Sequence, residues 1–394
     1  MRVLVGHNRY TQHGGEDAVF NAEVAMLESN GHEVIVFEKS NNQIASMSKA
    51  SAAMSFVWSR ESKRELQEVI GRRRPEIAHF HNTFPLISPS AYYACKEAGI
   101  PVVQTLHNYR LLCPAYTLVR NGEVCEICIN KSFAWPAIRY RCYRGSAMQS
   151  AGVGAMLTIH RLMKTWSETV SAYIALTQFS RGKFIEGGFP AEKMHVKPNF
   201  MVPAQSSTPA LHERNYLLFV GRLSHEKGTD VLLHALTRLR HIPVKIIGDG
   251  PLAEQLDSFI QDNGLTNVER IGQLPHDEVL PFVEAAACLV VPSRWYEGFP
   301  MTIVEAFSRA VPVIAARLGS LAEIVDDGTT GLHFDSGSSE DLARKLDWGW
   351  SNKEAMRAMG DNALREFRDN YLPQRNHEIL MTIYKSAIGT GDPT

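Results

Sequence analysis

The sequence predicts an α/β protein built from two doubly wound, parallel-sheet domains. Short β-branched runs alternate with longer helical patterns, a stretch rich in proline and serine interrupts this alternation once, and the alternation then resumes. Such a pattern is typical of parallel sheets whose crossover helices cover both faces. With 394 residues, 44% of them hydrophobic and 21% charged, the chain is long enough for two domains with full cores.

The first domain is predicted at residues 1–200. Its strands are expected at Val3–Val5, Val34–Glu38, Ile77–His79, Val102–Leu106, Ile174–Leu176 and Val196–Lys197. Helical patterns such as Ala18–Ser29 and Ser90–Ala98 separate these strands. A linker is predicted at residues 201–212, where prolines fall among serines and end the pattern.

The second domain is predicted at residues 213–374. Its strands are expected at Tyr216–Val220, Val244–Ile247, Cys288–Val291 and Val313–Ala315, and its helices include Thr229–Arg238 and Ile303–Ala310. A last helix, roughly Arg375–Ala387, lies in a final segment at 375–394. Ligands of such sheets bind beyond the carboxyl ends of the strands, so we expect two facing domains to share one cleft.

The turn between the strand Cys288–Val291 and the next helix carries two glutamates, Glu297 and Glu305. The first N–H groups of a helix lack internal partners and favour a phosphate. Pro300 suits the first helical turn, which leaves Met301 and Thr302 as donors. Glu297 can then face a polyol, and Glu305 can accept from a second pair of hydroxyls. A phosphate flanked by hydroxyl groups indicates a nucleotide sugar; the alternative is a pair of solvated charges.

A second turn of the same domain carries Arg222 and Lys227, between the strand Tyr216–Val220 and the helix Thr229–Arg238. Two cations at the end of a strand can neutralise the charge that develops on a departing diphosphate. Taken alone, cations on a loop are more often simply solvated.

Two features of the first domain are candidate ligand contacts. Gly14 and Gly15 precede a helix and would allow a phosphate or sugar to approach the backbone, although a structural turn is the alternative. This loop lacks the G-x-G-x-x-G spacing of dinucleotide-binding sites, which argues against an oxidoreductase. His107 follows the strand Val102–Leu106 and is flanked by Asn108. Arg110, close by, could meet an acidic or phosphorylated acceptor.

These segments, followed by 310–316 and 319–331, resemble the retaining glycosyltransferases of the family-4 type. The resemblance extends over nearly the whole chain. It implies the GT-B fold, in which two Rossmann-like domains face a central cleft and the last helix crosses back to the first domain. It also implies donor contacts at Gly14, Gly15, Arg222, Lys227, Glu297, Gly298, Phe299, Pro300, Met301, Thr302 and Glu305. Of these, Glu297, Arg222 and Lys227, together with His107, are the expected catalytic residues.

The predicted function is therefore transfer of a hexose-type sugar from a nucleotide diphosphate sugar to a glycan, lipid-linked or small-molecule acceptor, in polysaccharide or glycoconjugate biosynthesis. The resemblance implies retention of configuration, and no metal is needed if the cations stabilise the leaving group. Two alternatives are a sugar-nucleotide epimerase of the same fold and a nucleic-acid-binding protein with a degenerate site. The formal net charge of −1 gives no general attraction for nucleic acid, so none is expected as a partner.

An insertion near residues 108–145 contains four cysteines, Cys113, Cys125, Cys128 and Cys142. Their spacing leaves two interpretations open: a structural zinc site, or four cytosolic thiols. In either case the insertion is expected to shape the acceptor side.

The amino terminus enters a strand directly, which does not resemble a signal peptide, and no apolar run approaches the length of a membrane span. We therefore expect a cytoplasmic protein. Residues 139–144 interleave arginines with aromatic side chains and precede an apolar stretch. This segment could contact the inner face of a membrane, but a solvated face beside a core helix is the favoured interpretation.

Overall fold

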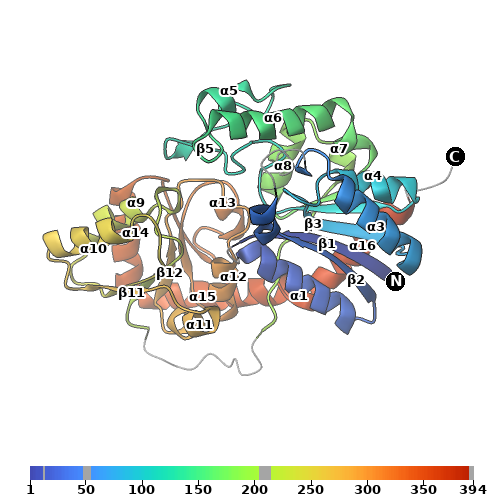
Figure 1. The fold of residues 1–394 in the computed structure, drawn as a ribbon. Helices are drawn as coiled ribbons and strands as arrows, with labels where there is room; N and C mark the ends of the chain where they lie inside the picture. The colour runs from blue at the N-terminus through green and yellow to red at the C-terminus, as the bar shows by residue number, and fades with distance from the viewer. Residues whose placement is uncertain (12–13, 48–54, 204–213, 390–394) are drawn as a thin grey trace. The chain divides into compact units, whose positions relative to one another are not determined.

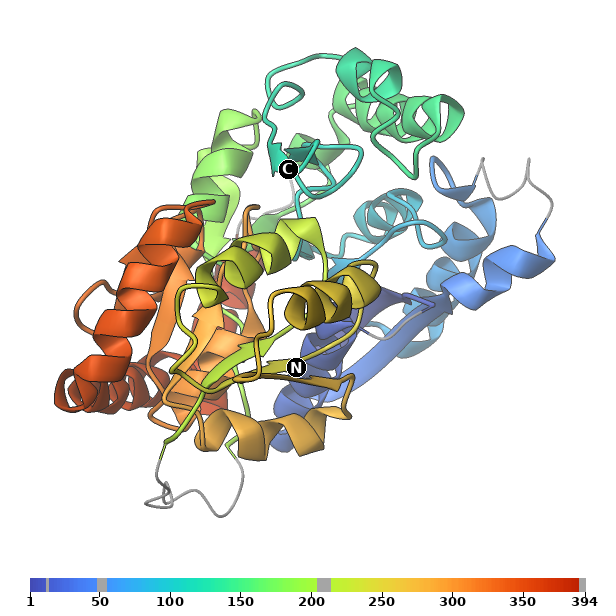
Figure 2. The same ribbon diagram turned by 90° about the vertical axis from the view of Figure 1, so that its left-hand side faces the viewer.

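The computed structural model describes residues 1–11, 14–47, 55–203 and 214–389, and most of the predicted linker, from residue 204 onward, lies outside these ranges. The chain divides into two compact units. Unit 1 comprises residues 1–118, 125–199 and 373 onward, and unit 2 comprises residues 119–124 and 200–372. In each unit, helices cover both faces of a parallel sheet (Figure 1 and Figure 2).

The sheet of unit 1 has the strand order β2-β1-β3-β4-β7-β8. Its strands are β1 (Arg2–Arg9), β2 (Glu33–Ser40), β3 (Ile77–Asn82), β4 (Val102–Leu106), β7 (Ala172–Ala175) and β8 (Met194–Val196). Its helices are α1 (Gly15–Ser29), α3 (Arg60–Arg73), α4 (Ser90–Glu97), α5 (Trp135–Arg139), α6 (Ala147–Leu162), α7 (Thr165–Glu168), α8 (Gln178–Glu186) and α16 (Pro373–Gly389), with 3-10 helices at Asn41–Ser46 and Ala191–Lys193. The order reverses between β1 and β3, and this point is where ligands of doubly wound sheets bind.

The two faces of β3 show how the chain covers this sheet. Successive side chains of a strand point to opposite faces. Phe80 contacts the ring of Tyr92 in α4, with ring centroids 5.5 Å apart. His79 points the other way and bonds the hydroxyl of Tyr384 in α16 at 2.8 Å. The last helix therefore packs on the sheet of unit 1, as predicted.

The sheet of unit 2 has the strand order β11-β10-β9-β12-β13-β14, the order of a Rossmann fold. Its strands are β9 (Leu217–Val220), β10 (Val244–Ile247), β11 (Val268–Gly272), β12 (Cys288–Val291), β13 (Val313–Ala316) and β14 (Gly331–Phe334). Its helices are α9 (Thr229–Leu236), α10 (Ala253–Asp262), α11 (His276–Glu284), α12 (Met301–Ser308), α13 (Leu321–Ile324), α14 (Ser339–Ser351) and α15 (Lys353–Asn370), with a 3-10 helix at His225–Lys227. The hairpin of β5 (Val119–Arg120) and β6 (Glu123–Val124) also belongs to this unit.

A close backbone contact fixes the loop that follows β9. Gly228 has a φ of +70°, and a Cβ atom at this position would lie 1.9 Å from the carbonyl oxygen of Pro292, just beyond β12. Only glycine satisfies both conditions. The contact draws the loop after β9 against the loop after β12, and so places Lys227 beside the turn that carries Glu297.

Candidate active site

The two predicted loops of unit 2 lie at one position in the sheet. Strand β12 pairs with β9, and the order of the strands reverses between them. Parallel neighbours end on the same edge, so residues 221–228 and 292–300 meet at the point where such sheets bind ligands. The topology therefore brings Lys227 and Glu297 together, although 70 residues separate them in the chain.

Glu297 is the centre of a small buried cluster. Its side chain is inaccessible to solvent apart from about one-twentieth of its surface, and its Oε1 atom accepts hydrogen bonds from Lys227 Nζ at 2.7 Å and Ser293 Oγ at 2.6 Å. Both hydrogen bonds use the same oxygen. Oε2 bonds no other residue in the described part of the chain, so it remains available to a ligand. Lys227 also lies 5.4 Å from the ring centroid of Trp295. Ser293 was not predicted, because a serine beside a proline carries no distinctive sequence signal.

The start of α12 offers backbone donors. The helix runs over Met301–Ser308, and Pro300 is its N-cap with an extended ψ of 109°. The prediction that Pro300 lies in the first helical turn was therefore wrong by one position, because its ψ is not helical. No side chain caps this end of the helix. The N–H groups of Met301 and Thr302 thus follow directly after the loop of Gly298 and Phe299.

Glu305 lies in the second turn of α12 and is buried. Burial raises its pKa above the ordinary value, and the imidazole of His276, whose Nδ1 is 3.8 Å from Glu305 Oε1, opposes that shift. A buried glutamate with few hydrogen-bond partners needs a polar ligand to complete its hydrogen bonding. The two glutamates therefore differ: Glu297 is held by the protein, while Glu305 is not.

Arg222 differs from Lys227 in the same way. Its side chain is exposed at the end of β9 and makes no hydrogen bond or ion pair with any residue that the structure describes. The guanidinium can reorient toward an anion without losing an existing bond. Arg222 is therefore the cation of this site whose removal disturbs the protein least.

A first prediction separates the glutamates. If Glu305 binds the ribose, Glu305→Ala should weaken the nucleotide diphosphate and the intact donor to a similar extent. Glu297→Ala should spare nucleotide binding and lower turnover, because Glu297 is expected to contact the sugar and not the nucleotide. Calorimetric titration with the free nucleotide and steady-state kinetics measure the two effects, and equal losses of nucleotide affinity would reject the division of roles.

The glycines of unit 1 lie at the start of α1. Gly14 is the N-cap in an extended conformation, and its N–H donates to Asp17 Oδ2 at 3.0 Å. Both Gly14 and Gly15 are exposed, and a Cβ atom at either would meet no other atom within 4 Å. Neither glycine has a positive φ, so the turn itself does not require them. Their absent side chains leave open space in front of the helix.

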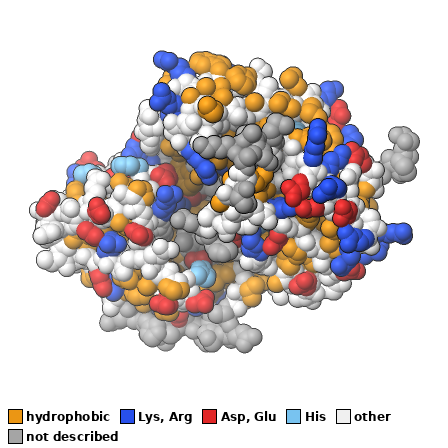
Figure 3. All heavy atoms as spheres, in the orientation of Figure 1, with side chains coloured by type: hydrophobic (Ala, Val, Ile, Leu, Met, Phe, Trp, Pro, Cys, Tyr) orange, Lys and Arg blue, Asp and Glu red, His pale blue; other side chains and the backbone are white. Residues whose placement is uncertain are grey.

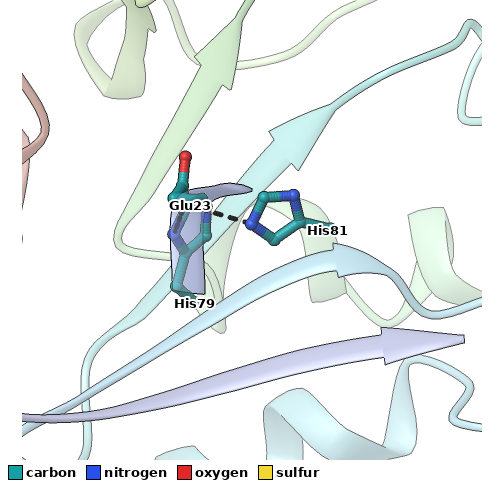
Figure 4. Close-up of side chains that lie close together, drawn as sticks. All are labelled: Glu23, His79 and His81. Carbon is teal, nitrogen blue, oxygen red and sulfur yellow. Dashed lines mark hydrogen bonds and ion pairs between the residues drawn. The ribbon is translucent and has the colours of Figure 1, made fainter. Parts of the chain in front are cut away.

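His107 ends a chain of buried polar side chains that the sequence analysis did not predict. Figure 4 shows its centre, where His79 and His81 of β3 point toward Glu23 of α1. Glu23 Oε1 lies 2.9 Å from His79 Nδ1 and 3.0 Å from His81 Nε2, and Oε2 accepts from Lys197 Nζ at 2.8 Å. His81 Nδ1 in turn lies 2.9 Å from His107 Nε2.

Protonation states along this chain determine the orientation of the His107 hydrogen bonds. Burial alone would raise the pKa of Glu23, but Lys197 and the two imidazoles hold it well below its usual range. Burial lowers the pKa of His81 to about 4 against the opposing effect of Glu23. Burial and then His81 hold the pKa of His107 well below its ordinary value. Both rings are therefore neutral near pH 7: His81 donates to Glu23, His107 Nε2 donates to His81, and His107 Nδ1 is an acceptor.

The same cluster has the geometry of a metal site, since the ligand atoms of Glu23, His79 and His81 lie within 4.8 Å of one another. Its hydrogen bonds, however, are already complete. Lys197 is bonded to Glu23 and to Asn376 Oδ1 at 2.9 Å, and His79 Nε2 is 2.7 Å from Thr105 Oγ1. An ammonium group 2.8 Å from the carboxylate would repel a cation. We therefore interpret the cluster as a hydrogen-bond network that joins α1 and α16 to the sheet.

Asn108 has a local reason to be an amide. Its Nδ2 donates to Glu16 Oε1 at 2.8 Å, and its Oδ1 accepts from the backbone N–H of Arg110 at 3.0 Å. Burial raises the pKa of Glu16. An aspartate in place of Asn108 would put a second carboxylate beside Glu16 and could not donate to it, so this position favours the amide.

The four cysteines of the insertion are near enough for Cys113, Cys125 and Cys142 to act electrostatically on the thiol of Cys128. All four are thiols, and Cys142 packs against a small core cluster of Cys128, Ala134 and Ala137. Burial raises the pKa of the Cys128 thiol to about 11. Within the described residues, the side chains whose ligand atoms converge are Glu23, His79 and His81 and not these cysteines. The geometry thus gives the zinc interpretation no support.

The surface around α5 and α6 combines apolar and basic side chains. Its exposed apolar residues are Phe133, Trp135, Tyr140, Met148, Ile159, Leu162 and Met163. Arg139, Arg141 and Arg144 are exposed in the same segment. Figure 3 shows hydrophobic side chains gathered over this region with basic ones beside them. Among the described helices, none is long and apolar enough to cross a membrane.

Two family models match adjoining parts of the chain: "Glycosyltransferase Family 4" over residues 14–205 and "Glycosyl transferases group 1" over residues 204–366. An uncharacterised glycosyltransferase of Methanocaldococcus jannaschii is 38% identical over 157 residues, which cover 40% of this chain and 44% of that protein. The O-antigen chain mannosyltransferase C of Escherichia coli is 28% identical, with 44% and 47% covered. The chain thus matches less than half the length of these two relatives.

Similarity to a solved structure extends over nearly the entire chain. The structure of Anabaena HepE in complex with UDP superposes with a TM-score of 0.68 and 19% identity, covering 98% of this chain and 100% of that one. The complex of the same protein with UDP-glucose gives 0.65 and 19%, covering 97% and 99%. At this identity the similarity shows the fold.

Proposed function

We propose that this chain, which belongs to the glycosyltransferases of the family-4 type with the GT-B fold, moves a hexose-type sugar from a nucleoside diphosphate sugar to a glycan, lipid-linked or small-molecule acceptor. The observation that carries the proposal is the cluster of Lys227, Ser293 and Glu297, which lies where the strand order of unit 2 reverses and next to the uncapped start of α12. UDP and UDP-glucose bound to HepE support a nucleotide sugar as donor.

Each side chain has a role that follows from its setting. Glu305 accepts from the ribose, because it is buried with few partners. The N–H groups of Met301 and Thr302, together with Arg222 and Lys227, bind the diphosphate and stabilise the charge that develops as it leaves. Glu297, oriented by Ser293 and Lys227, accepts from the sugar hydroxyls.

His107 of unit 1 also faces the sugar in this proposal. Its Nδ1 acceptor suits a sugar hydroxyl as donor, and Gly14 and Gly15 leave room for the backbone of α1 to approach the sugar and phosphate. Screening nucleotide sugars for thermal stabilisation tests the donor class, since a ligand at about 100 times its Kd adds roughly 2.7 kcal/mol. If no nucleotide sugar stabilises the folded protein, the proposal fails.

A second prediction concerns stereochemistry. Double displacement needs a carboxylate nucleophile below the anomeric carbon, and both Glu297 and Glu305 have other roles here. We expect the acceptor to attack from the face that the diphosphate leaves, with a phosphate oxygen taking the acceptor proton. Proton NMR of the product should then show the anomeric configuration of the donor. An inverted coupling constant would contradict retention, and a one-sugar adduct seen by intact-protein mass spectrometry would reveal a nucleophile.

Peripheral contact with a membrane remains part of the proposal, through the apolar and basic surface of α5 and α6. Apolar side chains beside arginines suit the boundary of an anionic bilayer, where a lipid-linked acceptor would be reached. A cytoplasmic location is the setting in which such an enzyme meets nucleotide sugars. Sedimentation with anionic vesicles tests the contact.

A further inference from the structure

Arg110 is a buried cation that forms no ion pair with the residues that the structure describes. Its side chain is 8% exposed, and its Nη1 atom is buried without a hydrogen-bond acceptor. No ion pair or side-chain hydrogen bond joins its guanidinium to any residue in the described ranges. Removing a charge from water costs several kcal/mol unless another group compensates it. The protein therefore tolerates a cation here whose charge is not neutralised.

Three aromatic rings surround the guanidinium. Its central carbon lies 4.1 Å from the ring centroid of Phe84, 4.7 Å from that of Tyr116 and 5.5 Å from that of Tyr143. Ring faces attract a cation without accepting its N–H donors in the plane of the fork. The rings thus fix the orientation of Arg110 and leave in-plane donors for a planar or tetrahedral oxyanion.

The carboxyl group of Glu16 interacts electrostatically with Arg110 but forms no ion pair with it among the described residues. Oε1 of Glu16 is bonded to Asn108. Burial raises the pKa of Glu16, and the bonds from Asn108 and Tyr10 and the charge of Arg110 oppose that rise. The hydroxyl of Tyr10 is a further group in range of this charge. The charge of Arg110 is thus only partly balanced by the protein.

Arg110 and His107 line the same cavity. It measures about 50 Å³ and is also bordered by His81, Asn108 and Phe84. All of these residues belong to unit 1. A group held by Arg110 would therefore lie in the space that His107 also borders, on the domain predicted to hold the acceptor.

We propose that Arg110, held between Phe84, Tyr116 and Tyr143, binds an oxyanion of the acceptor, either a phosphate of a phosphorylated or lipid-linked acceptor or the carboxylate of an acidic sugar. Guanidinium forks bind both groups through paired N–H donors. Assigning this anion to the acceptor rests on the proposed function, but the existence of an anion site does not.

The test compares anion binding by calorimetry in the whole protein, using methyl phosphate and methyl glucuronide as probes. Wild type should bind one or both, and Arg110→Met should weaken that binding by at least about tenfold, the scale of losing a hydrogen bond to a charged group. Arg139→Met removes an exposed arginine of the same insertion and should change nothing. Arg222→Ala should also leave this binding intact, which separates it from the diphosphate site.

The outcomes distinguish the sources and the possible failures. Binding of methyl phosphate alone identifies a phosphate-bearing acceptor, and binding of methyl glucuronide alone identifies an acidic sugar. If Arg110→Met does not fold, Arg110→Lys keeps a cation between the rings, loses the planar fork and should bind more weakly than wild type. The proposal is overturned if wild type binds neither probe, or if the Arg110 variants bind the probes as tightly as wild type does. It is also overturned if Arg139→Met loses as much affinity as Arg110→Met. Binding of the donor is measured separately with nucleotide sugars. A failure of the anion site would therefore leave the proposed donor binding standing, and the reverse also holds.

Discussion

Glu23→Ala is expected to lower the free energy of unfolding by about 3–5 kcal/mol, the cost of breaking a buried ion pair by removing one partner. The substitution leaves the Lys197 ammonium, which is 1% exposed, without its carboxylate. It also removes the acceptor shared by His79 and His81. Chemical denaturation followed by circular dichroism measures the loss.

Two variants control this prediction. Glu28→Ala removes an exposed glutamate from the same helix and should change the free energy of unfolding by no more than about 0.5 kcal/mol. Adding Lys197→Met to Glu23→Ala should recover part of the loss, because the unpaired charge is then gone. Two results would show that Glu23 and Lys197 are not coupled. One is a Glu23→Ala protein as stable as Glu28→Ala. The other is a double variant that is less stable than Glu23→Ala by the full cost of Lys197→Met alone.

The position of the two loops of unit 2 could be predicted, because each loop follows directly after a strand in the sequence. Each ligand-binding loop follows a strand directly, so a buried run followed by Glu297, or by Arg222 and Lys227, places these side chains at the binding edge. The helix α12 follows at once and adds its N–H groups. The predicted position of Pro300 was wrong, because residue type alone does not determine whether a proline caps a helix or enters its first turn.

The polar network of unit 1 could not be predicted in the same way, since its members are distant in the chain. Glu23 and Lys197 are 174 residues apart, and their pairing depends on how α1 packs against the end of β8. One signal was present: His79 and His81 alternate with apolar residues in β3, which indicates a polar side chain on a buried face. A buried polar pair implies partners, but not which partners.

The first strand was predicted too short for a related reason. The predicted strand ended at Val5, whereas β1 continues to Arg9. His7 and Asn8 are polar but fully buried, because His7 pairs with Asp17 at 2.8 Å and Asn8 with Asn41 at 2.8 Å. A hydrophobic pattern ends where polar residues begin, even when tertiary partners allow the strand to continue. The additional residues bring the end of β1 to Arg9, five positions before Gly14, the N-cap of α1.

The cations of unit 2 carry the last prediction. Arg222→Ala and Lys227→Ala should each lower kcat/KM by at least about 100-fold, the scale on which one preorganised charge-stabilising donor acts. The structure separates the two variants. Arg222 is exposed and has no partner among the described residues, so Arg222→Ala should leave stability unchanged. Lys227→Ala also deprives the buried Glu297 of its ammonium partner, so this variant should be destabilised as well.

Arg238→Ala removes an exposed arginine just beyond the C-terminal end of α9; it is the matched control and should keep the wild-type rate. Steady-state kinetics with thermal unfolding of each variant separates a catalytic loss from unfolding. Because the two cations are proposed to stabilise the departing diphosphate, chelating divalent metals should leave the wild-type rate unchanged. A rate that collapses with chelator and returns with magnesium, in a protein that stays folded, would mean that Arg222 and Lys227 are insufficient. Full activity of Arg222→Ala would remove the exposed guanidinium from the mechanism and leave the diphosphate to Lys227 and the N–H groups of α12.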